Sequence, residues 1–268
     1  NTRYKLMDIE KLKYEAQSKA LHIADVSGSA LLNADCMDIL SLIPNKSVQL
    51  ILADLPYGTT ANKWDSVLEL NKLWEQYERI LKPKGNIVLF GAGMFAFKLA
   101  LSNEKLFRYD MVWKKSKCGS PFTAKYMPLK KHEMILVFGE SASYYLPQLT
   151  EGKPYKRKWT PNKQNNMKYG IKGVQTDNKG TRHPTTVLDF PQQWRRQDQK
   201  HPTQKPLDLI KWLITAYSQE NEYVIDNTMG SGTTCLGAKE LNRRFIGIEK
   251  ETEYYNIAVG DVLGSHYR

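Results

Sequence analysis

The chain has 268 residues and a formal net charge of +11, with 41% hydrophobic and 11% aromatic residues. This composition supports a packed core and excludes a mainly disordered chain, and no run approaches the roughly 18 apolar residues of a membrane span. Three scattered cysteines without paired spacing disfavour a disulfide framework and a zinc site, and fit a reducing cytoplasm. Residues 1–10 contain no apolar signal core, so we expect no secretion signal.

After a helix expected over residues 5–22, the apolar pattern alternates between short strands and amphipathic helices. Strands are predicted at 48–53, 87–90, 109–113, 134–138, 223–226 and 245–249. Helices are predicted at 68–81, 94–102, 207–217, 233–241 and 252–262. Strands that alternate with helices predict an α/β fold with a mostly parallel sheet covered on both faces.

A basic, irregular segment interrupts this pattern. Residues 111–200 hold 18 Lys and Arg against 6 Asp and Glu, whereas the rest of the chain holds 21 against 22. This concentration of charge favours a nucleic-acid partner over a merely solubilising surface. The aromatic residues interleaved with the cations can stack on bases or equally form a small satellite core. We therefore divide the chain into four parts. Residues 1–29 form an N-terminal extension, residues 30–139 and 200–268 form the two halves of one α/β domain, and residues 140–199 form an inserted region between the halves.

A glycine loop runs from a predicted strand into a predicted helix at residues 224–234, VIDNTMGSGTT. Gly230 and Gly232 let the backbone turn tightly and approach a ligand, and Glu249 ends the next strand, where a carboxylate can accept hydrogen bonds from ribose hydroxyls. This unit predicts a nucleoside-cofactor site, with an ordinary strand-to-helix turn as the alternative. A dinucleotide fingerprint needs a third glycine where Cys235 stands, so a nucleoside without phosphates, such as S-adenosylmethionine, is favoured.

The first predicted strand ends in ADLPYG, residues 53–58. Asp54 offers a carboxylate, Leu55 and Pro56 offer backbone carbonyls, and Tyr57 offers an aromatic face. This set suits a planar ring with an exocyclic amine, because the amine can donate to Asp54 and to a carbonyl while Tyr57 stacks on the ring.

These segments together resemble a known family. Residues 54–57 resemble the Asp-Pro-Pro-Tyr motif of amino-group DNA methyltransferases, and the glycine loop resembles their Asp-Pro-Phe-x-Gly-Ser-Gly-Thr-Thr motif. The segment HPTQKP at residues 201–206 is similar to the one that precedes that loop in the family. Residues 33–40 and 44–48 match the family's sequence before the catalytic motif. The order of the motifs is the permuted arrangement called the beta class. Three short segments, residues 58–60, 63–65 and 129–133, most resemble the sequences of solitary phage or prophage members of the family.

The resemblance implies a Rossmann-like S-adenosylmethionine-dependent methyltransferase fold that flips a base out of duplex DNA and methylates adenine N6. It implies no metal, and a homodimer whose interface the sequence does not locate. The residues that match the family's motifs are given roles by this resemblance. The catalytic candidates are Asp54, Leu55, Pro56 and Tyr57. The cofactor-binding candidates are Asp35, Thr203, Lys205, Asp226, Gly230, Gly232, Thr233 and Glu249, although Asp35 can equally be a helix N-cap. The DNA-binding candidates are Lys114, Lys115, Arg157, Lys158, Arg195 and Arg196.

Two departures from the family pattern keep alternatives open. Leu55 replaces the first proline of the catalytic motif, and Asn227-Thr228 replaces Pro-Phe before the glycine loop. A catalytically impaired DNA-binding relative is therefore one alternative. A cytosine-N4 enzyme is another, although the aspartate at position 54 resembles adenine-specific members, whereas cytosine-specific ones more often carry serine. A Rossmann oxidoreductase is disfavoured by the missing third glycine and by the Asp54 turn.

Overall fold

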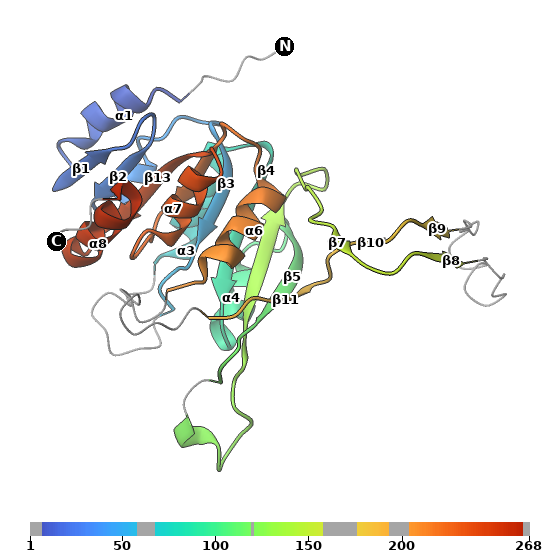
Figure 1. The fold of residues 1–268 in the computed structure, drawn as a ribbon. Helices are drawn as coiled ribbons and strands as arrows, with labels where there is room; N and C mark the ends of the chain where they lie inside the picture. Colours follow the sequence, from blue (N-terminus) through green and yellow to red (C-terminus); the bar gives the residue numbers. More distant parts are fainter. Residues whose placement is uncertain (1–6, 58–67, 119–120, 158–175, 193–203, 265–268) are drawn as a thin grey trace. The chain divides into compact units, whose positions relative to one another are not determined.

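The computed structural model describes residues 7–57, 68–118, 121–157, 176–192 and 204–264 (Figure 1). The chain divides into two compact units. The first contains Asn1–Leu146 and Thr186–Arg268, and the second contains Pro147–Thr185. Among the described residues, no helix has both the length and the apolar run needed to cross a bilayer.

In the described part of the first unit, nine strands form one sheet in the order β1-β2-β13-β12-β3-β4-β6-β5-β11. The strands from β2 to β4 are mutually parallel, whereas β1 is antiparallel to β2, and β6 is antiparallel to both β4 and β5. This mixed, mostly parallel sheet is the predicted one. Its strands are β1 (His22–Asp25), β2 (Ala30–Asn33), β3 (Val48–Ala53), β4 (Leu81–Gly91), β5 (Phe107–Lys114), β6 (His132–Gly139), β11 (Val187–Asp189), β12 (Tyr223–Asp226) and β13 (Arg244–Glu249).

Helices supply apolar side chains to two core clusters, one on each face of this sheet. The first cluster takes residues from α1 (Ile9–Ala16), α2 (Cys36–Leu40), α3 (Leu70–Ile80) and α4 (Met94–Ser102). The second takes residues from α6 (Leu207–Tyr217), α7 (Thr233–Glu240) and α8 (Thr252–Leu263).

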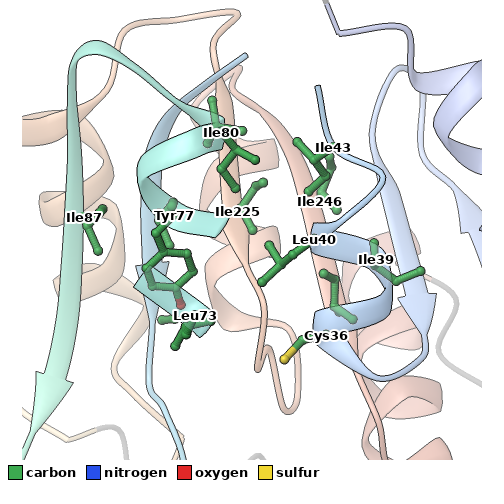
Figure 2. Packing of buried hydrophobic residues seen from close by; sticks show 14 of the residues in the cluster. Cys36, Ile39, Leu40, Ile43, Leu73, Tyr77, Ile80, Ile87, Ile225 and Ile246 are labelled. Atoms are coloured by element: carbon green, nitrogen blue, oxygen red, sulfur yellow. The ribbon is translucent and has the colours of Figure 1, made fainter. Parts of the chain in front are cut away.

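The apolar run of β3 is explained by burial on both faces. Ile51 and Ala53 belong to the first cluster, whereas Leu50 and Leu52 belong to the second, so both faces of the strand from Leu50 to Ala53 are apolar. Figure 2 shows Tyr77 of α3 packed in the first cluster among side chains of the neighbouring strands and of α2. The two clusters hold the sheet rigid where its parallel strands end.

The expected helix over 5–22 is wrong at its carboxyl end. The helix α1 begins after Asp8, whose carboxylate accepts the Lys11 N–H at 3.0 Å, and it ends at Ala16. Residues 22–25 instead form β1, an edge strand whose backbone pairs with β2. Of the expected helix only His22 lies in β1, and residues 17–21 belong to neither a helix nor a strand. β1, β2 and α2 are elements that the periodicity did not predict.

The second unit consists of short paired strands. In its described residues β7 (Thr150–Glu151) pairs with β10 (Thr181–Arg182), and β8 (Tyr155–Arg157) pairs with β9 (Thr176–Asn178). The Arg182 guanidinium lies 4.9 Å from the centroid of the Tyr155 ring and donates to Asn178 Oδ1 at 2.7 Å. The carboxyl end of the expected inserted region behaves differently, because β11 joins the main sheet beside β5.

Gly247 brings the glycine loop close to β13. A Cβ at this position would overlap Met229 Sδ, Cys235 Sγ and the Leu31 side chain. The absence of a side chain at Gly247 therefore lets Met229 of the loop and Cys235 of α7 pack directly on the strand.

We expect Gly247→Ala to lower the free energy of unfolding by about 1–3 kcal/mol, because the added methyl overpacks a filled core. Urea unfolding measures this loss. In a Met229→Ala background the same substitution should cost less, because the nearest overlapping atom is gone. An unchanged midpoint for Gly247→Ala alone would contradict the packing argument.

Candidate active site

Asp54 lies directly after β3, at the edge where the parallel strands end. Its Oδ1 accepts a hydrogen bond from the Tyr57 hydroxyl at 2.7 Å, and its Oδ2 forms an ion pair with the Lys205 ammonium. The Tyr57 ring stacks on Phe95 of α4 with centroids 4.7 Å apart. Leu55 is buried in the first core cluster, so its side chain anchors the turn where the family has proline.

Lys205 lies between two carboxylates. Besides Asp54, its Nζ is 3.3 Å from Glu133 Oε2, and it lies 4.9 Å from the centroid of the Phe90 ring. Glu133 in turn forms an ion pair with Lys115. Four charges of alternating sign therefore connect the ends of β3, β5 and β6 with the segment that leads into α6.

Burial and pairing act in opposite directions on these charges. Burial lowers the pKa of the Lys205 ammonium, but the carboxylates of Asp54 and Glu133 outweigh it, so the pKa is raised. Burial likewise raises the pKa of the Glu133 carboxyl, but Lys205 and Lys115 outweigh it, so the pKa is lowered. Both groups are therefore held in their charged forms. Among the described residues, Glu133 Oε2 has no hydrogen-bond donor of good geometry.

The glycine loop forms the second half of the site. Gly230 and Gly232 have positive φ angles of 53° and 80°, as the predicted tight turn requires. Glu249, at the end of β13, accepts the Gly230 N–H at 2.9 Å and the Glu251 N–H at 2.8 Å. A Cβ at Gly232 would lie 2.8 Å from the Ala258 Cβ, so this glycine lets α7 and α8 approach each other.

The two residues that depart from the family motif connect the two halves. The Thr228 hydroxyl donates to the backbone carbonyl of Asp54 at 3.1 Å. Asn227 Oδ1 accepts a hydrogen bond from the buried Tyr77 hydroxyl at 2.5 Å, while Asn227 Nδ2 has no acceptor among the described residues. The polar pair thus fastens the loop both to α3 and to the Asp54 turn.

Both halves line one cavity of about 270 Å³. Its walls include most of the predicted catalytic and cofactor-binding residues, and also Glu133 and Asn227, which the sequence reasoning did not select. The cavity residues that the sequence selected are Asp35, Asp54, Leu55, Pro56, Tyr57, Lys205, Asp226, Gly230, Thr233 and Glu249. The described residues contain no cluster of side chains suited to a metal ion.

Asp35 lines the cavity and is also the N-cap of α2, where it accepts the Met37 N–H at 3.0 Å, so the alternative role is confirmed. The remaining candidates have other positions. Lys114 pairs with Asp189 at 2.5 Å, and Arg157 is exposed on β8 of the second unit. Four candidates lie outside the described residues: Thr203, Lys158, Arg195 and Arg196. Two of the segments that resemble phage members, 58–60 and 63–65, also lie outside them.

Glu133 directly precedes the apolar run of β6, so the sequence does show an acidic residue at one end of this predicted strand. A sequence alone does not show that β6 runs antiparallel to β4. This direction brings the first residues of β6, rather than its last, to the edge where Asp54 lies.

Comparisons with known proteins agree with this arrangement. A sequence profile of the N6/N4 DNA methylase family matches residues 48–260. The type II methyltransferase M2.LlaDCHI of Lactococcus lactis subsp. cremoris is 27% identical over 285 residues, covering 94% of this chain and 96% of that protein. The type II methyltransferase M.BglII of Bacillus subtilis is 30% identical over 249 residues, covering 84% and 66%.

Solved structures show the same fold. A complex of M1.HpyAVI with SAM covers 87% of this chain and 98% of its own, with a TM-score of 0.58 at 23% identity. The cytosine-N4-specific PvuII DNA methyltransferase covers 91% and 89%, with a TM-score of 0.65 at 17% identity.

A buried carboxyl in the cavity makes stability depend on pH. Burial raises the pKa of Asp226 from 3.8 to about 7, against hydrogen bonds from Thr234 and Thr228 that lower it. Between about pH 4 and pH 7 the native state therefore holds a proton that the unfolded chain has lost, so the free energy of unfolding falls progressively over that range and levels off above about pH 7.

We expect wild type to lose about 2–3 kcal/mol relative to Asp226→Asn between pH 5 and pH 8, because asparagine stays neutral throughout. Urea unfolding of both proteins without added ligands measures the difference. Parallel stability profiles for the two proteins would contradict the raised pKa.

Proposed function

The chain belongs to the N6/N4 DNA methylase family, and we propose that it transfers the methyl group of S-adenosylmethionine to the exocyclic N6 amine of adenine in duplex DNA. The α/β fold with its mostly parallel sheet is the one predicted for such an enzyme. The observation that supports the reaction best is the position of Asp54, which lines the same cavity as the glycine loop.

The cavity residues fit a nucleoside cofactor with a charged amino-acid tail. Glu249 offers carboxylate oxygens to ribose hydroxyls, and Asn227 Nδ2 is a donor that lacks an acceptor among the described residues. Gly230 and Ser231 provide a close backbone approach, and Asp226 lines the adjoining wall. When bound, the cofactor supplies a methyl group already activated by its sulfonium.

The protein's own contribution is to orient the amine. In our proposal Asp54 accepts one N–H of the flipped base, a carbonyl of Leu55 or Pro56 accepts the other, and Tyr57 stacks on the ring. The nitrogen would gain the methyl carbon as the bond from that carbon to the sulfonium sulfur breaks, leaving a neutral thioether. The nitrogen also loses one proton, and we assign Asp54 as the acceptor of that proton. The ion pair with Lys205 supports the orienting part of this role, because it holds the Asp54 carboxylate in place at the cavity wall.

Adenine is proposed over cytosine because aspartate stands at the head of the catalytic turn, as in the adenine-specific members that the motif resembles. Cytosine-N4 transfer is the second candidate, and the fold shared with a cytosine-N4-specific enzyme favours it. Both amines present the same two N–H groups to Asp54 and a carbonyl, so the geometry of the turn suits either base.

We also propose that the second unit recognises the target sequence. Pro147–Thr185 contains nine Lys and Arg against two Asp and Glu, which suits contact with phosphates. The similarity to solitary phage members and the expected homodimer stay predictions.

The test uses tritiated S-adenosylmethionine, unmethylated duplex DNA and digestion to nucleosides. We expect label in N6-methyladenine. Label in N4-methylcytosine would select the second candidate, and no label despite intact DNA binding would indicate the impaired relative.

Asp54→Asn should lower the rate of transfer roughly 10²- to 10⁴-fold while cofactor affinity changes little, because only the acceptor charge is removed. Asp110→Asn, a neutralised carboxylate exposed on β5, is the matched control and should keep wild-type activity. Transfer at the wild-type rate by Asp54→Asn would refute the role assigned to Asp54.

A further inference from the structure

The hairpin that joins β5 to β6 combines charge with exposed aromatic rings. Its residues 115–131, here called the basic hairpin, include five lysines and no aspartate or glutamate. Every residue from 124 to 132 is exposed. Figure 1 shows this segment extending beyond the sheet at the ends of β5 and β6.

The base of the basic hairpin adjoins the active site. The Lys115 N–H donates to the Lys131 carbonyl at 2.9 Å, and the Lys115 ammonium pairs with Glu133, which lines the cavity. At the carboxyl end of β4, Gly91 pairs with Met134 of β6. The hairpin therefore projects from the same edge of the sheet that holds Asp54.

The tip of the hairpin is folded and presents two large rings to solvent. Residues Pro121–Thr123 form a 3₁₀ turn, and the Thr123 carbonyl accepts the N–H groups of Tyr126 and Met127 at 2.9 and 3.0 Å. Phe122 is 87% exposed and Tyr126 is 85% exposed. An ordered turn that keeps two aromatic side chains in water is typical of a binding surface.

Resting on the proposed function, we propose that the tip of the basic hairpin enters duplex DNA beside the target base. Extruding a base breaks stacking on both of its sides, and an inserted apolar ring can take the vacated place. Phe122 and Tyr126 supply the rings, while Lys125, Lys130 and Lys131 neutralise the adjoining phosphates.

Charge selects DNA over a second copy of the chain. A twofold interface centred on the basic hairpin would place five lysines opposite five others, and these would repel. A polyanion with stacked rings complements both the cations and the aromatic side chains.

The test compares two substrates that carry the sequence methylated by the wild-type chain. One is fully paired, and the other has an abasic site opposite the target base, so that extrusion breaks no base pair. We expect Phe122→Ala and Tyr126→Ala each to lower kcat/KM roughly 10- to 100-fold on the paired duplex. On the abasic duplex both variants should come within about threefold of wild type.

Two controls distinguish insertion of the Phe122 and Tyr126 rings from a general surface effect and from phosphate binding. Tyr14→Ala removes an aromatic ring that is 74% exposed on α1 and should match wild type on both duplexes. The double variant Lys130→Gln/Lys131→Gln should weaken both duplexes equally and reduce the slope of log K against log salt concentration by about 2. Fluorescence of 2-aminopurine at the target position reports extrusion directly, and it should fall in the two ring variants.

Wild-type rates for both ring variants on the paired duplex would overturn the inference, as would equal losses on both duplexes. Loss of an oligomer in sedimentation when either ring is removed would also overturn it, because the tip would then contact a second copy. If the wild-type chain transfers no methyl group to any DNA, the proposed function itself fails. That outcome is distinct from a methylating wild type whose ring variants are unimpaired.

Discussion

The ion-pair chain Asp54–Lys205–Glu133–Lys115 is the interaction on which the site depends. A buried charge is strongly unfavourable unless an opposite charge and hydrogen bonds compensate it. Here Lys205 and Glu133 each contact two opposite charges, and Asp54 contacts Lys205 and the Tyr57 hydroxyl, so each of the three charges has partners that compensate its burial. Because the four residues come from four separate segments, their pairing also fixes where those segments meet. Removing the charge of Lys205 alone would leave two carboxylates facing each other inside the cavity.

Much of the fold could be predicted because burial on both faces produces apolar runs of strand length. β3, β12 and β13 are of this kind, and α6 carries buried apolar residues along most of its length. β1 could not be predicted in this way. Its residues are partly exposed at a sheet edge, and its backbone pairing with β2 depends on a strand that follows it in the chain.

The site was predictable wherever a motif stands at the end of a parallel strand. Asp54 and the glycine loop are found by that rule, since β3 and β12 lie side by side in the sheet. Glu133 was missed because strand direction decides which end of β6 reaches the cavity. The partners of Lys205 were also missed, because the resemblance of residues 201–206 to a family segment gave this residue a cofactor role and no ion pair, whereas its ammonium pairs with Asp54 and Glu133. Asn227 and Thr228 replace the family's Pro-Phe, and the structure gives both of them hydrogen-bond partners outside the loop.

The reversed direction of β6 has an evolutionary consequence. In an all-parallel sheet, each strand end at the catalytic edge leads into a crossover helix that must pack on the core, so its length is constrained. Between β5 and β6 the chain needs only a hairpin, and both strands are already fixed by their neighbours. The connection can therefore lengthen, shorten or change composition among descendants without repacking either core cluster. This edge is where a lineage of such enzymes can acquire new substrate contacts at the lowest risk to folding.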